Sequence, residues 1–406
     1  MASATPVGAS DAPMPARMSG SSIGDALGGH RNSLGVLRLV LAGLVIFDHA
    51  FPLGGFGEDP FWRYTSGQTS LGGIAVGGFF AISGYLIIKS GASADIVQFL
   101  WRRAIRIFPA FWGVLLVAAC IVGPLAWRLS GRGLRDYFSF HSDGPWGYIA
   151  SNWTLQINRY GIYDIFLGTP YGEQTGASVF NGSLWTLWYE WGCYMMVAVL
   201  AIAGVLARAR VLVVVLAFLV FAVKMLAAVD AAAPAVILPL FGDPQVLFLA
   251  SAFLCGAVLG IYSDRIPFAD GLGVASGALF VVSLFYGGFA IIGIPCGAYF
   301  LLYLAARLPR SFQWIGARND YSYGVYVYGF LVQQCLAALG VHRWGYLPFA
   351  FAAIPITFGL AWLSWHLIEK RALALKSWGP GRGIAYWSQR TADRRHARTD
   401  RRQIGA

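Results

Sequence analysis

The part of this sequence with the clearest capacity for chemistry is an apolar run from Leu34 to Leu53 that contains an arginine and a histidine. The run has about the length of a membrane-spanning helix, in which ionisable side chains are costly and by default functional. Along a helix, the step from Arg38 to His49 turns through about 1100°, which places both side chains within roughly 20° of one face and about 16 Å apart. We therefore expect a polar face on this helix. The alternatives are that Arg38 reaches the lipid headgroups and that His49 is a hydrogen-bonded packing residue.

Glu190 is a second ionisable residue inside an apolar run, which begins near Asn181 and extends to about residue 206. If the two runs cross the membrane in opposite directions, His49 lies about 6 Å and Glu190 about 10 Å below the same surface. They can then meet in one cavity, where the carboxylate would orient the imidazole. Such a pair suits a general base that removes a proton from a hydroxyl during acyl transfer.

Two further arginines, Arg103 and Arg106, lie in a basic segment that precedes an apolar run at about 108–127. Residues three apart are neighbours on a helix, and guanidinium groups bind phosphates through paired hydrogen bonds. The pair therefore predicts a phosphate-bearing ligand that enters from the cytoplasm, unless these charges only orient the chain in the membrane. Ser83 and Gly84, within the apolar run 71–89, either shape the site or form a packing notch.

The composition identifies the class of protein that must position these residues. Of 406 residues, 57% are hydrophobic and 12% are charged, about half the charged fraction of a soluble protein. Many of the basic residues behind the net charge of +11 cluster in short segments between apolar runs and in the C-terminal tail, which argues against nucleic-acid binding. The five cysteines are widely spaced in apolar runs and predict neither disulfides nor a metal site.

We predict an all-α, polytopic transmembrane bundle of about ten spanning helices, with the N and C termini both cytoplasmic. Three segments divide the chain: a flexible tail at 1–30, the membrane-embedded domain at 31–371, and a basic cytoplasmic tail at 372–406 that contacts membrane lipid. No signal peptide is expected. The predicted spans cover residues 34–53, 71–89, 108–127, 181–206, 211–229, 245–262, 271–290, 291–306, 322–340 and 347–368.

The longest connection, residues 128–182, is rich in aromatic and polar side chains. This composition is equally suited to stacking on sugar rings and to lying at the membrane interface.

Several stretches resemble the motifs of the acyltransferase-3 family, membrane O-acyltransferases that modify bacterial surface glycans. They are Arg38 with His49, Phe79-Phe80-Ala81-Ile82-Ser83-Gly84, Arg103-Ala104-Ile105-Arg106, Ser183-Leu184-Trp185-Thr186-Leu187-Trp188-Tyr189-Glu190, Asp320-Tyr321-Ser322-Tyr323-Gly324-Val325-Tyr326 and Trp365-His366-Leu367-Ile368-Glu369-Lys370. The resemblance covers residues 34–371, in the order expected of the family.

The resemblance implies a bacterial inner-membrane enzyme that transfers an acyl group, by family frequency acetyl, from acyl-CoA to a hydroxyl of a surface or lipid-linked polysaccharide. It implies His49 as the catalytic residue with Glu190 beside it, and Arg38, Arg103 and Arg106 as donor-binding residues. Ser83 and Trp185 are assigned to shaping the site. We expect no permanently bound cofactor and no metal. Direct transfer and a covalent acyl-enzyme both remain open.

The sequence departs from the family at two places. Tyr328-Gly329 stands where members often have a histidine. No C-terminal hydrolase-like domain follows the last apolar run, so a periplasmic partner that takes part in transfer would be a separate protein. The alternative function is a proton-coupled transporter or exporter of a glycan or small metabolite, because intramembrane His, Glu and Arg also suit proton-coupled transport. The sequence shows no clear internal repeat of the kind found in many transporters.

Overall fold

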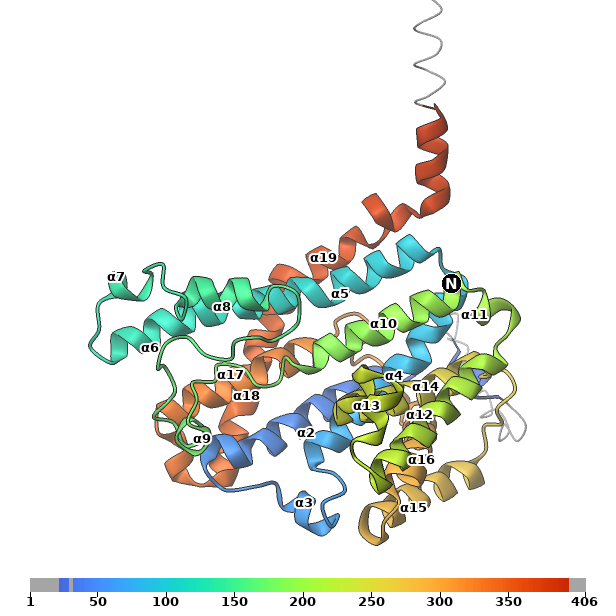
Figure 1. The fold of residues 1–406 in the computed structure, drawn as a ribbon, viewed down its shortest axis with the longest axis horizontal. Coiled ribbons are helices and arrows are strands. Elements are labelled where there is room, and N and C mark those ends of the chain that lie inside the picture. The colour runs from blue at the N-terminus through green and yellow to red at the C-terminus, as the bar shows by residue number, and fades with distance from the viewer. Residues whose placement is uncertain (1–21, 29–31, 394–406) are drawn as a thin grey trace, which may run out of the picture.

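The protein is an all-helical bundle in the computed structural model, which describes residues 22–28 and 32–393 (Figure 1). Within these ranges the regular structure consists of helices, and the one β interaction is an isolated bridge between Ser22 and Pro267. The predicted all-α class is therefore confirmed.

Seven helices in the described part of the chain are long and apolar enough to span a membrane. They are α2 (Leu34–Gly54), α4 (Leu71–Ser93), the helix Ile96–Leu129 that includes α5 (Ile96–Val117) and α6 (Gly123–Leu129), α12 (Val211–Val229), α14 (Pro244–Ile261), the helix Phe289–Arg307 that includes α16 (Ile294–Arg307), and the helix Tyr346–Ser377 that begins with α18 (Tyr346–Ser364). The chain is thus a multi-pass membrane protein. The count of about ten spans and their orientation remain predictions.

The three remaining predicted spans form helices of 17 residues, α10 (Thr186–Ile202), α15 (Asp270–Tyr286) and α17 (Ser322–Ala338). They are somewhat shorter than the about 20 residues that cross a bilayer. Nearly every side chain of α17 is buried, and the helix packs against α2 and α18. Because its neighbours surround it, α17 forms the centre of the half of the bundle that holds the site.

The predicted start of the third span, near residue 108, is wrong. The helix begins at Ile96, because Asp95 accepts hydrogen bonds from the amides of Val97 and Gln98 and caps it. The basic segment therefore lies inside α5, and the helix continues without a break through a π-helical turn at Ala118–Val122 (η1).

The predicted start of the fourth span, near Asn181, is also wrong, because α10 begins at Thr186. The amide of Asn181 donates a hydrogen bond to the Val327 carbonyl (2.7 Å), and the Ser183 hydroxyl donates one to Asn181 (2.8 Å). The first contact joins the segment to α17 and the second lies within it, and such side-chain hydrogen bonds compete with helical pairing, so residues 181–185 remain non-helical.

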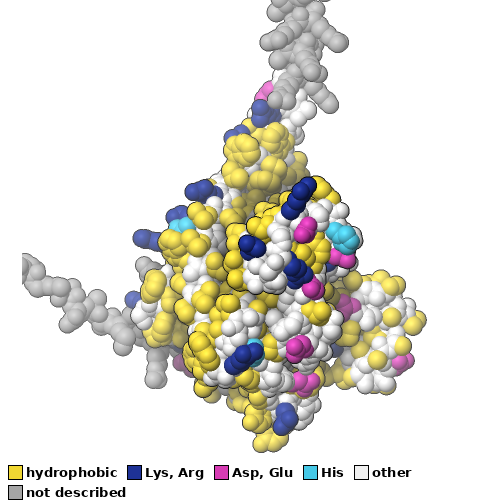
Figure 2. Space-filling view, turned by 90° about the vertical axis from the view of Figure 1, so that its left-hand side faces the viewer, with side chains coloured by type: hydrophobic (Ala, Val, Ile, Leu, Met, Phe, Trp, Pro, Cys, Tyr) yellow, Lys and Arg dark blue, Asp and Glu magenta, His cyan; other side chains and the backbone are white. Residues whose placement is uncertain are grey.

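The connection between α6 and α10 forms one end of the molecule, on the left in Figure 1. It contains α7 (Leu134–Tyr137), α8 (Pro145–Asn152) and α9 (Pro170–Thr175), and α9 packs against α2. In the view of this end, basic and acidic side chains are intermingled, with hydrophobic side chains around them (Figure 2). We call this connection, residues 130–185, the outer loop.

The two tails are described only in part. Residues 22–28, from the predicted flexible tail, are packed: the Gly24 amide bonds to the Ser263 carbonyl (2.7 Å) and Ile23 is buried. On the C-terminal side, Trp101 and Gln98 of α5 donate hydrogen bonds to the carbonyls of Leu375 and Gly381 (both 2.9 Å). Part of each predicted tail thus covers the membrane domain, and the remainder lies outside the described residues.

Candidate active site

A cavity of about 100 Å³ lies between α2, α4, α5, α10 and α17. Its walls include five of the seven residues that the sequence singles out: Arg38, Ser83, Arg103, Arg106 and Glu190. Four different helices contribute them, so the site exists only in the folded bundle. We call it the arginine cavity.

Close helix packing sets the position of Ser83. Its neighbour Gly84 lies against α14, where an added Cβ would come within 1.9 Å of the Phe253 carbonyl oxygen. Gly256 of α14 makes the reciprocal approach to Ala81, also at 1.9 Å. The two interpretations of Ser83 and Gly84 therefore describe adjacent faces of one helix: glycine forms the packing notch and serine lines the cavity.

Asp320 joins two of the three cavity arginines. One of its oxygens lies 2.5 Å from Arg38 Nη1 and 2.5 Å from Arg106 Nη2, while the other accepts hydrogen bonds from the Ser322 hydroxyl and amide. Burial alone would raise the pKa of Asp320, but the two guanidinium charges and the Ser322 hydrogen bond outweigh it and hold the pKa far below its usual range. Asp320 thus links α2 and α5 to the start of α17 and remains ionised.

Arg103 differs from the other two arginines. Its guanidinium lies over the Tyr194 ring, 6.0 Å from the centroid, and its buried Nε has no hydrogen-bond partner. Within the described residues, Arg103 forms no ion pair. Glu190 accepts a hydrogen bond from the Tyr194 hydroxyl. Arg103 and Glu190 therefore flank the same tyrosine without forming an ion pair, although the Glu190 carboxylate attracts the Arg103 guanidinium electrostatically.

His49 is not among the residues that line the arginine cavity. Its ring makes an edge contact with Phe330, with centroids 5.2 Å apart, and the side chain is half-buried. Among the described residues nothing forms a hydrogen bond with the imidazole, so the pairing of His49 with Glu190 remains a prediction. Trp185 also lies outside the cavity lining and packs edge-on against Tyr189, with centroids 5.4 Å apart.

One face of α17 separates the arginine cavity from His49. Tyr326 lines the cavity, and Phe330, one turn further along α17, contacts His49. The Tyr326 hydroxyl lies 2.5 Å from the Thr186 hydroxyl, and an added Cβ on Gly182 would approach the Phe330 ring within 2.6 Å. The non-helical segment 181–185 therefore completes this wall, and His49 lies about one helical turn beyond the cavity.

Asp320, Tyr194 and Glu369 are charged or polar residues near the cavity arginines that were not predicted as site residues. Glu369 is buried in a π-helical turn, Trp365–Glu369 (η6), where one oxygen accepts from Ser364 (3.1 Å) and the other has no partner. Asp320 had a usable signal: it is the sole carboxylate between Arg307 and Ser322, just before an apolar helix. No three His, Cys, Asp or Glu side chains in the described ranges gather as a metal site would require.

The chain is similar to known proteins over most of its length. A family model described as an acyltransferase domain, acyltransferase-3, matches residues 31–366. An O-acetyl transferase of Shigella phage Sf6 is 32% identical over 365 residues, which cover 85% of this chain and 97% of the relative. Nodulation protein 10 of Rhizobium leguminosarum bv. viciae is 30% identical over 389 residues, 86% of this chain and 95% of the relative. No solved structure matches the chain at a significant level. The chain therefore belongs to the acyltransferase-3 family and is an O-acyltransferase.

Proposed function

We propose that this protein, in the inner membrane of a bacterium, transfers an acetyl group from acetyl-CoA to a hydroxyl of a surface or lipid-linked polysaccharide. The observation that carries the proposal is the state of Arg103, a cation that lines the arginine cavity and, among the described residues, is attracted by Glu190 without forming an ion pair with any carboxylate. Leaving such a cation unpaired is unfavourable unless a ligand neutralises it. The phosphates of CoA are suitable ligands for a guanidinium.

In this proposal the three arginines divide the work on the donor. Arg103 contacts the phosphates directly, whereas Asp320 holds Arg38 and Arg106 and so fixes the shape and charge of the channel. The cavity, about 100 Å³, is smaller than the roughly 300–1,000 Å³ of pockets for ligands of drug size. Binding of acyl-CoA therefore requires the helices around the cavity to separate.

His49 would act on the acceptor. An imidazole nitrogen takes the proton of the acceptor hydroxyl while the oxygen of that hydroxyl attacks the thioester carbonyl carbon. The carbon–sulfur bond then breaks, and the CoA thiolate leaves and takes up a proton. For this step the thioester must pass Tyr326 and Phe330, which lie between the cavity and His49. A covalent acyl-histidine is the alternative form of the same chemistry.

The test is release of CoA from acetyl-CoA by the purified chain in nanodiscs, with a de-O-acetylated bacterial O-polysaccharide as acceptor. Loss of a general base lowers the rate by about 10²–10⁴-fold, so His49→Ala should abolish release. The matched control is His342→Ala in the turn Val341–Trp344 (η5), which should release CoA like the wild type. Equal release by both variants would overturn the role of His49.

A binding measurement then tests whether acetyl-CoA is the donor. Acetyl-CoA should bind the wild type and the Arg102→Ala variant but bind Arg103→Ala at least about tenfold more weakly. Arg102 is the matched control because it is the adjacent arginine and does not line the cavity. If none of the three proteins binds or consumes acetyl-CoA, the donor is not a CoA thioester and the proposal fails.

A further inference from the structure

A second cavity lies between α6 and the outer loop, and it shares no lining residue with the arginine cavity. Its volume is about 500 Å³, and its walls include Trp127, Arg132, Asp143, Arg159, Tyr163 and Asp164. We call it the loop cavity. Neither the mechanism nor the family comparison assigns it a role.

The charges of the loop cavity are balanced in pairs. Arg132 lies 2.7 Å from Asp164, and Arg159 lies 2.5 Å from Asp143. All four side chains remain between 31% and 57% exposed, so each keeps donors or acceptors that face solvent. Exposed ion pairs contribute little to stability. Two cations and two anions around one cavity suit a neutral ligand with many hydroxyl groups better than a phosphate.

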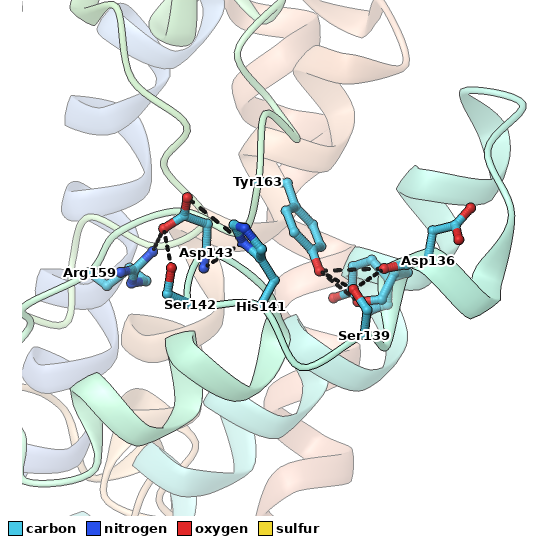
Figure 3. Close-up of polar contacts among 8 residues, drawn as sticks. Asp136, Ser139, His141, Ser142, Asp143, Arg159 and Tyr163 are labelled. Atoms are coloured by element: carbon cyan, nitrogen blue, oxygen red, sulfur yellow. Dashed lines mark hydrogen bonds and ion pairs between the residues drawn. The ribbon is translucent and has the colours of Figure 1, made fainter.

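Fixed backbone geometry holds the cavity open. Tyr163 has a φ of 50°, which is unusual for a residue other than glycine, and its amide donates to the Asp143 carbonyl (2.9 Å). Its hydroxyl donates to the Tyr137 carbonyl (3.1 Å) and points toward Ser139, as Figure 3 shows together with the pairing of Asp143 and Arg159. Next to it, the Trp127 ring lies 4.8 Å from the Tyr163 ring, and the Arg132 guanidinium covers the Trp127 ring at 3.6 Å. The polar groups are therefore pre-positioned for a ligand.

A short segment connects this cavity to His49. Ser178 lines the loop cavity, and Gly182, four residues later, lies against the Phe330 ring. Four extended residues span at most about 14 Å, and the Phe330 ring lies 5.2 Å from that of His49. Between these points Val179 packs in one cluster with Ile46 and Leu53 of α2. An oligosaccharide chain is long enough to occupy both places.

We propose that the loop cavity is a binding subsite for a neutral sugar unit of the acceptor, and that it holds the glycan while a neighbouring unit reaches His49. This inference rests on the proposed function. The sugar hydroxyls would accept from Arg132 and Arg159 and donate to Asp143 and Asp164, and both pairs would keep their mutual contact. The subsite selects for acceptor length and neutrality, which a reaction centre at His49 alone would not.

The test measures binding of the purified, full chain in nanodiscs to an array of neutral, amino-bearing and anionic bacterial oligosaccharides. The wild type should retain neutral oligosaccharides of several units. Arg159→Ala and Asp143→Asn should each bind them at least about tenfold more weakly. Asp143→Asn keeps the side-chain shape, so it separates a loss of binding from a loss of folding.

Two controls keep this inference distinct from the proposed function. Arg135→Ala removes the same charge from an exposed position of the outer loop that does not line the cavity, and it should bind like the wild type. His49→Ala should also bind like the wild type but release no CoA. The inference is overturned if the wild type binds no neutral glycan, prefers anionic ones, or binds equally well after the two cavity substitutions. If glycans bind as expected but no protein releases CoA, the proposed reaction fails and the subsite stands.

Discussion

At the arginine cavity two arginines share the Asp320 carboxylate and the third, Arg103, forms no ion pair within the described residues although Glu190 attracts it, whereas in the loop cavity each arginine has its own aspartate. The first cavity is enclosed by helices, where an uncompensated charge is costly, and the second is open to water, where charge pairs are weak. The same residue types therefore serve different purposes. The excess positive charge of the arginine cavity suits an anionic donor, and the balance of the loop cavity suits a neutral acceptor.

The largest effect should follow from removing the carboxylate that the two arginines share. Asp320→Asn keeps the shape of the side chain but leaves Arg38 and Arg106 close together without a counter-charge. Removing one partner of a buried ion pair costs about 3–5 kcal/mol, and we expect about 3 kcal/mol because the Asp320 side chain is 15% exposed. Thermal unfolding in detergent measures this loss.

The control for this prediction is Asp136→Asn in α7, whose exposed side chain forms no ion pair within the described residues. It should unfold at the wild-type temperature. If Asp320→Asn and Asp136→Asn unfold alike, the ion-pair network does not hold the helices together.

Lowering the pH should gradually remove the stabilisation that the ionised Asp320 carboxylate provides. The folded-state pKa of Asp320 lies below its unfolded value of about 3.9, so its stabilisation is complete above about pH 5 and is lost as the pH falls through the folded-state pKa. Between about pH 6 and pH 3 the unfolding temperature of the wild type should therefore fall more steeply than that of Asp320→Asn. Parallel curves would show that another group controls acid sensitivity.

Substitution of Arg103 should have a smaller effect: the stability of the protein is kept or increased, while its binding of acetyl-CoA is weakened. Arg103→Met removes a cavity cation without a carboxylate partner, so the protein should be as stable as the wild type or more stable, while acetyl-CoA binding weakens about tenfold. Arg106→Met removes a partner of Asp320 and should destabilise by about 1–3 kcal/mol. The two substitutions are matched in type and lie three residues apart on α5. If Arg103→Met destabilises as much as Arg106→Met, Arg103 has a structural partner and is not reserved for a ligand.

The residues that share one helix could be grouped from the sequence, because helical periodicity fixes them. Arg103 and Arg106 share α5 and line one cavity, whereas Arg38 joins them from α2 and His49, on the same helix as Arg38, does not line it. The prediction that His49 and Glu190 lie at similar depths in the membrane depended on where each helix was assumed to begin. Depth was counted from a helix beginning near Asn181, but α10 begins at Thr186, so Glu190 lies only about 6 Å along it.

The features that could not be predicted from the sequence depend on contacts between segments that are far apart in the chain. Asn181 leaves the helix because it bonds to Val327, and Asp320 pairs with arginines more than 200 positions away. Neither contact leaves a periodic trace in the sequence. The loop cavity has the same origin: aromatic and charged residues of the outer loop were visible, but whether they faced sugar or membrane depended on how the loop folds.

The smallest effect on stability, and the sharpest contrast between the two cavities, is expected for Arg159→Ala. The side chains of Arg159 and Asp143 are 31% and 57% exposed, so water solvates Asp143 when its partner is removed. The Arg159 guanidinium holds the pKa of Asp143 below its usual range, so the carboxylate is ionised at neutral pH with or without added salt. Thermal unfolding at low and high salt should therefore show almost no difference between Arg159→Ala and the wild type, although the variant binds neutral oligosaccharides more weakly. A large loss of stability would mean that the Arg159–Asp143 pair holds the outer loop together, and the weaker glycan binding of Arg159→Ala would then no longer indicate a subsite.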